Sequence, residues 1–409
     1  MKKLLIYLVP VFLVSFSSCR NADKYTDETY ENYVILVSFD GFRWDYPDMY
    51  DTPNFDAMAK NGVKAEGLIP SFPTKTFPNH YTLATGLYPD HHGLINNTFF
   101  APDLGLLYRI GNRDMVQNPD FYGGEPIWNT AERQGVKSAS FFWVGSEAKI
   151  GGLAPTYWKI YDGSVPFEAR VDTVVNWLKL PLEKRPRFIT LYFQEPDGIG
   201  HSFGPEHEET GKVIKELDGI LGKLRKELST LPYGNKVNLI VTSDHGMGEI
   251  SSERYVNIYG VVNEAWVEAD YGSDPVYLID AVDEFVDTLA YTLNAAEGVT
   301  AWQKDEIPAY LHYGTHPRIP DIVAVADSGW SLGVREQKAN SSYIGGTHGY
   351  DNTNSDMHAI FYAEGPAFKE DFVHKPFENV NVYILIAEIL GLEPAETDGD
   401  IELVRDMLK

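Results

Sequence analysis

A proline-bounded segment rich in hydroxyl residues is the first place in this sequence where chemistry could occur. It runs from Pro70 to Tyr81 and reads PSFPTKTFPNHY, with an apolar pattern behind it that suggests a helix. Pro78 suits the first turn of a helix, because its fixed φ fits and its missing N–H needs no partner there. Thr76 is then expected at or just before the helix N-terminus, where free N–H groups and the helix dipole attract anions. Thr76 is therefore either an ordinary helix cap or a nucleophile that attacks a phosphoryl group held there.

Acidic residues follow three apolar runs that are typical of strands buried on both faces. One such Asp is usually a helix cap or a turn residue, but ligand sites in α/β folds collect where the strands end. Three acids in this position favour a shared site. The runs and their acids are Tyr33–Phe39 before Asp40, Phe188–Phe193 before Asp197, and Val237–Thr242 before Asp244.

Histidines accompany two of these acids. Asp197 and His201 have the spacing D-x-x-x-H, which lets both side chains reach one point from a single turn. Asp244 and His245 are adjacent, so their side chains diverge and could bind two different metal ions. His348 lies in the glycine-rich sequence GGTHG. This mixture of nitrogen and oxygen ligands favours zinc over Mg²⁺ or Ca²⁺, whose sites are nearly all oxygen.

Two zinc ions roughly 4 Å apart would supply what a nucleophilic Thr76 needs. One would bind the threonine oxygen and favour its alkoxide, and the other would hold the leaving-group oxygen and activate water for a second step. The remaining histidines have no comparable context and are expected to be surface or hydrogen-bonded residues. They are His80, His91, His92, His207, His312, His316, His358 and His374.

Strand and helix patterns alternate along the chain, which is the signature of an α/β fold. Further strands are predicted at residues 138–143, 322–326 and 359–362, and helices at 52–60, 167–179, 210–227, 280–290 and 380–390. Residues 249–343 differ, because they are rich in Tyr, Gly and Asp and contain short alternating runs. We expect a mostly parallel central sheet with helices on both faces, and a smaller inserted α+β lobe at about 249–343.

Composition limits the possible partners. The 409-residue chain is 44% hydrophobic, enough for a large core, and carries a formal net charge of −25. Duplex nucleic acid is not an expected partner, since its backbone needs a basic surface. An acidic surface also repels a polyanionic substrate, so anion binding would depend on local positive charge such as metal ions. The oligomeric state is open.

The N-terminus indicates export. Lys2 and Lys3 precede an apolar run that is too short to span a bilayer comfortably but suits a signal peptide. The run ends in SFSSC, where Cys19 is the single cysteine of the chain, and this resembles a bacterial lipoprotein signal. The alternative is a plain secretory signal cut nearby. We expect a signal peptide at 1–18, lipidation of Cys19, a polar tether at 19–31 and a catalytic domain at 32–409, lipid-anchored in a bacterial cell envelope on the periplasmic or outer side.

Five motifs resemble those of the nucleotide pyrophosphatase/phosphodiesterase family, a branch of the alkaline phosphatase superfamily. They occur in the family's order, and the resemblance covers essentially the whole chain after the tether. The motifs are FDGFR at 39–43, PTKTFPNH at 73–80, EPDGIGH at 195–201, TSDHGM at 242–247 and GTHG at 346–349.

The resemblance implies an alkaline-phosphatase-like sandwich with two Zn²⁺ per chain and a phospho-threonine intermediate on Thr76. It places Asp197, His201 and His348 on one ion. It places Asp40, Asp244, His245 and the Thr76 oxygen on the other. Asn97 matches an asparagine that contacts a phosphate oxygen together with the Thr76 N–H, and Phe77 and Tyr161 match aromatic residues that sandwich a nucleobase. Simple core packing is the alternative for these two aromatic residues.

The expected activity is hydrolysis of nucleotide phosphodiester or pyrophosphate bonds to nucleoside 5′-monophosphates. Relatives in the superfamily are disfavoured, because sulfatases need a C/S-x-P-x-R motif that is absent here and phosphatases with a serine nucleophile do not match Thr76. Two alternatives stay open: the same mechanism acting on choline-type phospholipid headgroups, and a surface lipoprotein that binds a partner without catalysis.

Overall fold

The computed structural model describes residues 32–336 and 344–409. The predicted signal peptide, Cys19 and the tether therefore lie outside the described residues, as do residues 337–343. Residues Asn32–Lys409 group into one compact unit. Across the described ranges, no helix combines the length and the apolar character that crossing a bilayer requires.

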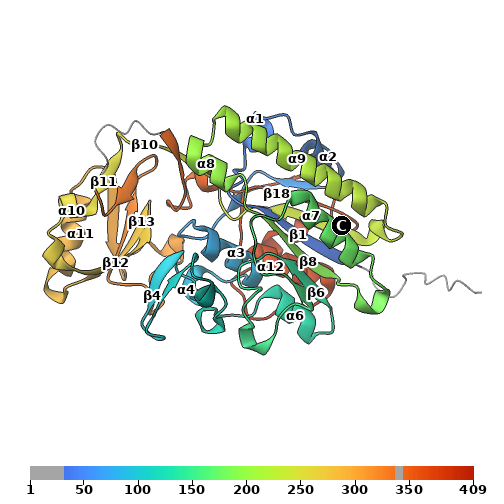
Figure 1. Cartoon of the computed structure of the whole chain (residues 1–409), viewed down its shortest axis with the longest axis horizontal. Coiled ribbons are helices and arrows are strands. Elements are labelled where there is room, and N and C mark those ends of the chain that lie inside the picture. Colours follow the sequence, from blue (N-terminus) through green and yellow to red (C-terminus); the bar gives the residue numbers. More distant parts are fainter. Residues whose placement is uncertain (1–31, 337–343) are drawn as a thin grey trace, which may run out of the picture. The chain divides into compact units, whose positions relative to one another are not determined.

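A central sheet of eight strands organises this unit, in the order β19-β2-β18-β9-β1-β8-β6-β7 (Figure 1). β18 runs antiparallel to its neighbours β9 and β2, and the other neighbouring pairs are parallel. The expected mostly parallel sheet is therefore confirmed. Its strands are β1 (Tyr33–Phe39), β2 (Val63–Ala65), β6 (Ser138–Phe141), β7 (Tyr157–Trp158), β8 (Phe188–Phe193), β9 (Val237–Thr242), β18 (Phe361–Glu364) and β19 (Phe372–His374).

Helices cover both faces of this sheet, as expected (Figure 1). α2, α7 and α9 contact one another on one face, and α3, α6 and α12 contact one another or β1 on the other. Because both faces are covered, all seven residues of the central strand β1 are buried. The helices are α2 (Pro53–Asn61), α3 (Thr76–Thr85), α6 (Ile127–Arg133), α7 (Phe167–Leu178), α9 (Glu208–Ser229) and α12 (Asn381–Leu390).

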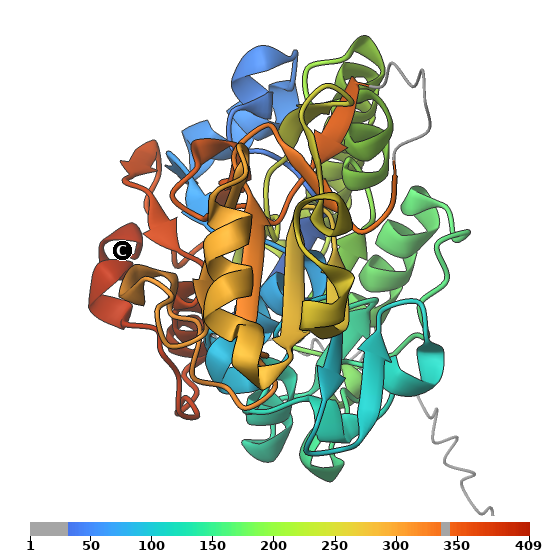
Figure 2. The ribbon, with the colours of Figure 1, turned by 90° about the vertical axis from the view of Figure 1, so that its left-hand side faces the viewer.

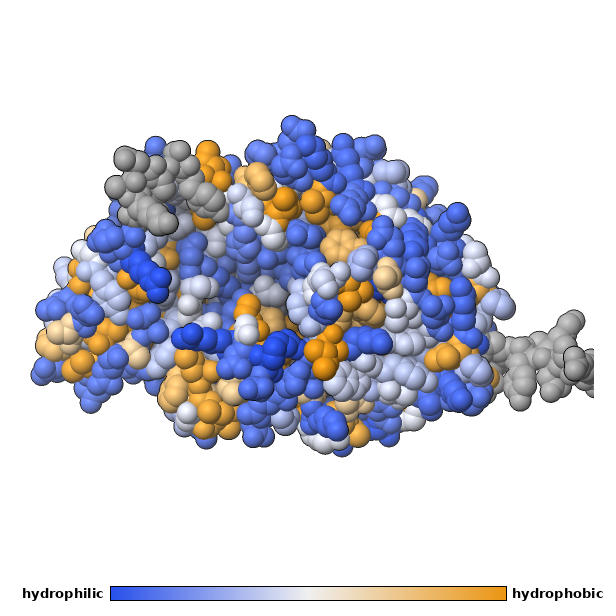
Figure 3. All heavy atoms as spheres, in the orientation of Figure 1, coloured by the Kyte–Doolittle hydropathy of each residue, from blue (hydrophilic) through white to orange (hydrophobic). Residues whose placement is uncertain are grey.

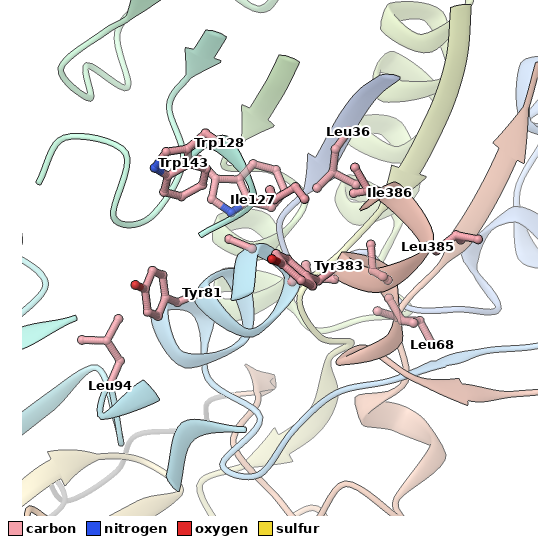
Figure 4. Packing of buried hydrophobic residues seen from close by; sticks show 14 of the residues in the cluster. Leu36, Leu68, Tyr81, Leu94, Ile127, Trp128, Trp143, Tyr383, Leu385 and Ile386 are labelled. Carbon is pink, nitrogen blue, oxygen red and sulfur yellow. The ribbon is translucent and has the colours of Figure 1, made fainter. Parts of the chain in front are cut away.

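The main core lies between the sheet and α12. Leu36 of β1, Tyr383 and Ile386 of α12, Tyr81 of α3 and Trp128 of α6 belong to one buried cluster (Figure 4). Burial of each large apolar side chain contributes about 1.5–3 kcal/mol. This core fixes the position of α3, whose N-terminus carries Thr76.

Residues 249–336 contain a second, antiparallel sheet of four strands, in the order β12-β13-β15-β14, with its own buried cluster. The helix α11 packs against β14 and β15 (Figure 2). We call this part the lobe; whether it is an insertion stays a prediction. Its elements are α10 (Ile258–Val261), β12 (Val267–Ser273), β13 (Val276–Ala281), α11 (Val286–Asn294), β14 (Val299–Gln303) and β15 (Ile322–Ala326).

Some element boundaries differ from the sequence-based expectation. The helix predicted at 280–290 begins at Val286, because Asp280 and Ala281 continue β13 and pair with β12. The strand predicted at 322–326 has its expected bounds and pairs with β13 and β14 of the lobe, within the range predicted for that part of the chain. The strand predicted at 138–143 ends at Phe141, since Phe142 has a φ of 61°.

Candidate active site

The three acids that follow apolar runs lie at the ends of three adjacent strands. β1 pairs in parallel with β8 on one side and β9 on the other, so Asp40, Asp197 and Asp244 emerge at the same edge of the sheet. Gly41 allows this approach: its φ is +70°, and a Cβ there would lie 2.9 Å from Cα of Asp197. The amide of Gly41 also donates to Oδ1 of Asp244 at 3.2 Å.

Thr76 is the first residue of α3. Lys75 precedes it in an extended conformation, and the N-cap makes no side-chain capping bond. The interpretation of Thr76 as an ordinary helix cap is therefore wrong, since its hydroxyl lies 3.2 Å from Nε2 of His245 instead. The Oδ1 atom of Asn97 accepts the Phe77 N–H at 2.9 Å, which places Asn97 beside the first turn of α3.

The loop before Thr76 is fixed by residues that sequence reasoning did not single out. The buried amide of Asn79 donates to the carbonyls of Ser71, Pro73 and Lys75 and accepts the Ser71 N–H. The Thr74 hydroxyl accepts the N–H of Gly349 at 2.9 Å. The loop before Thr76 is therefore bonded directly to the loop that carries His348. The only signal in the sequence was the run of hydroxyl and amide residues itself.

The predicted metal ligands come together in two clusters that share His245. Ligand atoms of Asp40, Asp244 and His245 lie within 4.8 Å of one another, and so do those of Asp197, His245 and His348. His201 stands beside the second cluster, with its Nε2 3.4 Å from Oδ1 of Asp197. The structure thus brings all six predicted side chains to one place, although it groups His245 with both clusters.

The donor set fits divalent metal ions. Each of the three histidines has its Nδ1 2.8 Å from a backbone carbonyl, of Gly346 for His201, Gly246 for His245 and Thr74 for His348. Those bonds set the tautomer in which Nε2 offers a lone pair, as metal-binding histidines require. In addition, Oδ1 of Asp40 and Oδ1 of Asp197 are buried and make no hydrogen bond to any described group. Oδ2 of Asp244 is buried as well, with Nε2 of His245 at 3.0 Å and Nδ1 of His80 at 3.2 Å. Buried carboxylate oxygens without partners are costly unless a cation binds them.

The electrostatics of the protein alone show the same need for a cation. Burial raises the pKa of Asp40, and the nearby carboxylates of Asp244 and Asp197 raise it further. Burial would also raise the pKa of Asp244, but His245 and His80 outweigh it and hold that pKa well below its usual range. Burial lowers the pKa of His348, and His245 adds to the effect. A bound cation would relieve the repulsion among the carboxylates.

A cavity of about 340 Å³ opens beside Thr76. Asp40, Thr76 and Asp197 lie at one side of it, and both Phe77 and Tyr161 line its walls. The Tyr161 side chain is 39% exposed, so core packing does not describe it. The other lining residues are Ile110, Gly111, Arg113, Val116, Phe142, Trp143, Val144, Gly145, Glu147 and Tyr192.

Three further residues at the site were missed by the sequence analysis. His80 is fully buried, with Nε2 2.9 Å from the Ser38 hydroxyl and Nδ1 3.2 Å from Oδ2 of Asp244. Its spacing of four residues from Thr76 on one helix was the available signal. Tyr192 donates its hydroxyl to Oδ2 of Asp40 at 2.6 Å. Glu147 accepts the Tyr161 N–H at 2.9 Å and pairs with Arg113. No sequence pattern marked these last two.

Residues 34–351 match the family model described as type I phosphodiesterase / nucleotide pyrophosphatase. A venom phosphodiesterase of Crotalus durissus collilineatus is 40% identical over 391 residues, which cover 92% of this chain and 46% of that protein. The human ectonucleotide pyrophosphatase/phosphodiesterase family member 1 is 37% identical over 388 residues, covering 92% of this chain and 42% of that protein. The chain thus spans about half the length of the curated relatives it matches.

Solved structures show the same likeness. Murine ectonucleotide pyrophosphatase/phosphodiesterase 5, an inactive threonine-to-alanine form in complex with AMP, has a TM-score of 0.87 and 36% identity. The similarity covers 93% of this chain and 100% of that one. The human protein of the same name has a TM-score of 0.87 at 35% identity.

Proposed function

Because this chain belongs to the type I phosphodiesterase / nucleotide pyrophosphatase family, we propose that it hydrolyses nucleotide phosphodiester or pyrophosphate bonds and releases nucleoside 5′-monophosphates. The observation that carries the proposal is the position of Thr76. Its hydroxyl lies at the start of α3, 3.2 Å from His245, where two clusters of metal-type ligands meet a cavity with aromatic walls. A nucleophile, a cation site and a nucleoside-sized cavity together suit this reaction.

The two clusters would hold two Zn²⁺ ions, with Asp197, His201 and His348 on one and Asp40, Asp244 and His245 on the other. Bound divalent ions would lower the pKa of the attacking hydroxyl and offset the charge of the phosphoryl group. The Thr76 oxygen then bonds to phosphorus as the bond to the leaving group breaks, which gives phospho-threonine. Water hydrolyses this ester, releases the 5′-monophosphate and restores the hydroxyl. Asn97 and the N–H groups at the start of α3 would stabilise a phosphate oxygen during both steps.

The aromatic side chains that line the cavity beside Thr76 favour a nucleotide as substrate over a choline-type phosphodiester. Phe77 and Tyr161 both line it, and flat side chains suit a nucleobase. AMP is bound in the murine relative, which is 36% identical to this chain.

A substrate panel tests the proposal. The purified protein is assayed with the p-nitrophenyl ester of thymidine 5′-monophosphate, p-nitrophenyl phosphate and p-nitrophenyl phosphorylcholine, with chelator or with added zinc. We expect zinc-dependent cleavage of the nucleotide ester well above the other two. Preference for the phosphorylcholine ester would overturn the roles of Phe77 and Tyr161, and no turnover despite bound zinc would favour the non-catalytic binding protein.

We also propose that Cys19 anchors the protein to a membrane of the bacterial cell envelope. The support is the apolar run of residues 4–16 that precedes the single cysteine. Cys19→Ala should move the protein from the membrane fraction to the soluble fraction of expressing cells and abolish labelling by a radioactive fatty acid. An unchanged distribution and labelling would exclude this anchor.

A further inference from the structure

A groove lies between the lobe and the hairpin formed by β4 (Thr98–Ala101) and β5 (Leu106–Arg109), with a cavity volume of about 650 Å³. We call it the lobe groove. Thr98 and Arg109 line it from the hairpin, and Tyr271, Asp274 and Arg335 line it from the lobe. Phe100 of β4 stacks on Tyr271 of β12, with ring centroids 6.1 Å apart, which joins the two sides. The space-filling view shows the surface hollowed between the lobe and the body of the molecule (Figure 3).

The groove adjoins the candidate active site on both of its walls. Thr98 directly follows Asn97, the residue beside the first turn of α3. On the opposite wall, the carbonyl of Asp274 accepts a hydrogen bond from Nζ of Lys75 at 2.5 Å, and Lys75 directly precedes Thr76. Each wall therefore contains or contacts a sequence neighbour of a candidate-site residue, Thr98 beside Asn97 on one wall and Lys75 beside Thr76 on the other.

A second cavity continues the groove toward the aromatic cavity. It shares Thr98 and Arg109 with the groove, and Ile110, Gly111 and Arg113 with the aromatic cavity. The three cavities thus follow one another along the hairpin, and neighbouring cavities share lining residues.

The lobe groove contains two positively charged side chains that make no bond to the rest of the described protein. Arg109 and Arg335 are exposed, and no hydrogen bond or ion pair joins either guanidinium group to another described residue. The two carboxylates of the groove do have partners. Oδ2 of Asp270 accepts the Tyr259 hydroxyl at 2.6 Å, and Oδ1 of Asp274 accepts the Leu332 N–H at 2.7 Å.

This pattern is notable in a chain with 59 acidic and 34 basic side chains, where an exposed cation readily finds an acidic neighbour. Two unpaired guanidinium groups beside a phosphoryl-transfer site suit ionised phosphate oxygens, which they bind in bidentate fashion.

We propose that the lobe groove binds the leaving group of the substrate, and that Arg109 and Arg335 select leaving groups that carry ionised phosphate. The inference rests on the proposed phosphodiesterase function and deepens it. Nucleoside triphosphates and dinucleoside polyphosphates are then preferred over nucleotide esters with a small leaving group that carries no phosphate.

Steady-state kinetics on the purified full-length protein test this with two substrates. ATP has a pyrophosphate leaving group, whereas the p-nitrophenyl ester of thymidine 5′-monophosphate has a leaving group without phosphate. Arg109→Ala and Arg335→Ala should each lower kcat/KM for ATP by about tenfold, mainly through KM, because each removes a charge-assisted hydrogen bond. The ester should change less than about twofold, and Arg109→Lys, which keeps the charge but loses the bidentate geometry, should retain only part of the preference for ATP.

Lys226→Ala is the matched control, because it removes one exposed positive charge on α9 without touching the groove. Equal losses for ATP and the ester, no loss for either, or the same loss in Lys226→Ala would overturn the assignment. A wild-type protein that hydrolyses neither substrate would instead refute the proposed function.

Calorimetric titration with pyrophosphate then tests the groove without turnover. Binding that weakens about tenfold or more in the Arg109→Ala/Arg335→Ala double variant, but not in Thr76→Ala, supports the groove. Binding that is equally strong in the double variant, or absent in the wild type, rejects it.

Discussion

Thr76 and His80 lie four residues apart on α3, and both side chains meet the acidic ends of the central strands. The hydroxyl of Thr76 is 3.2 Å from His245, and Nδ1 of His80 is 3.2 Å from Oδ2 of Asp244. His80 is therefore placed to fix the orientation of the Asp244 carboxylate, because the hydrogen-bond partners of metal ligands set the geometry of those ligands. At the scale of single residues, the geometry of the candidate site depends on the hydrogen bonds that fix the second nitrogen or oxygen atom of each candidate metal ligand.

Thr76→Ala should abolish turnover of the nucleotide ester, by more than about 10³-fold, because it removes the attacking oxygen. Zinc content, measured by elemental analysis, should stay close to wild type, since the carboxylates and imidazoles remain. Thr76→Ser is the matched control and should retain measurable activity. Activity of Thr76→Ala within a few-fold of wild type would refute the nucleophile assignment.

Tyr192→Phe should weaken zinc binding by about 10–100-fold, because Oδ2 of Asp40 loses its hydrogen-bond donor at 2.6 Å. Competition with a chromogenic chelator measures the affinity directly. Tyr313→Phe serves as the control, since its buried hydroxyl donates to the carbonyl of Ile95 and contacts no ligand residue. Equal zinc affinities in the two variants would show that Tyr192 does not position Asp40.

At the scale of elements, the site depends on how closely two strand ends approach. The loop after β1 packs on the start of α8 (Asp197–Phe203), where the Asp197 N–H donates to the carbonyl of Asp40 at 2.9 Å. A side chain at Gly41 would separate these segments. The positive φ and the short contact both exclude other residues there.

Gly41→Ala should therefore lower the free energy of unfolding by more than the about 1–2 kcal/mol that a left-handed alanine costs, and should reduce metal binding as well. Denaturant unfolding and zinc titration measure the two effects. Gly105→Ala is the matched control, because Gly105 also has a positive φ, of 63°, but its Cβ would meet nothing within 4 Å. The inference fails if both variants lose the same stability and both keep wild-type zinc affinity.

At the scale of the whole molecule, the proposed cations would hold together segments from distant parts of the sequence. Asp40, Asp197, Asp244 and His348 come from four separate segments, and Asp40 and Asp197 each carry a buried oxygen without a hydrogen-bond partner among the described residues. A cation that binds only the folded state stabilises it by mass action.

Removal of metal by a chelator should thus lower the thermal midpoint by about 5 °C or more and abolish activity. Added zinc should restore both, whereas calcium should not. Asp40→Asn provides a comparison, because it removes one of the repelling charges and should show a smaller shift on chelation. If the chelator changes neither the thermal midpoint nor the activity of the wild-type protein, the proposed metal centre is excluded.

Much of this protein follows from the sequence alone. Largely apolar runs predicted β1, β8 and β9 at their observed bounds, because a strand buried on both faces is made mostly of apolar residues. The apolar runs did not indicate which strands would pair with one another. The apolar run Ile322–Ala326 belongs to the lobe sheet, and nothing within the run indicates its partners.

The sequence also determined which residue types could form the site, since the acids, the histidines and Thr76 stand in short local motifs. Only the tertiary structure decided which of them share a cluster, that His80 lies beside Asp244 and Tyr192 bonds to Asp40, and that Arg109 and Arg335 line one groove. The physical reason is that local motifs depend on neighbouring residues along the chain. Clusters and grooves depend instead on how the strands, α3 and the lobe pack against one another. Local sequence patterns do not predict which residues this packing brings into contact.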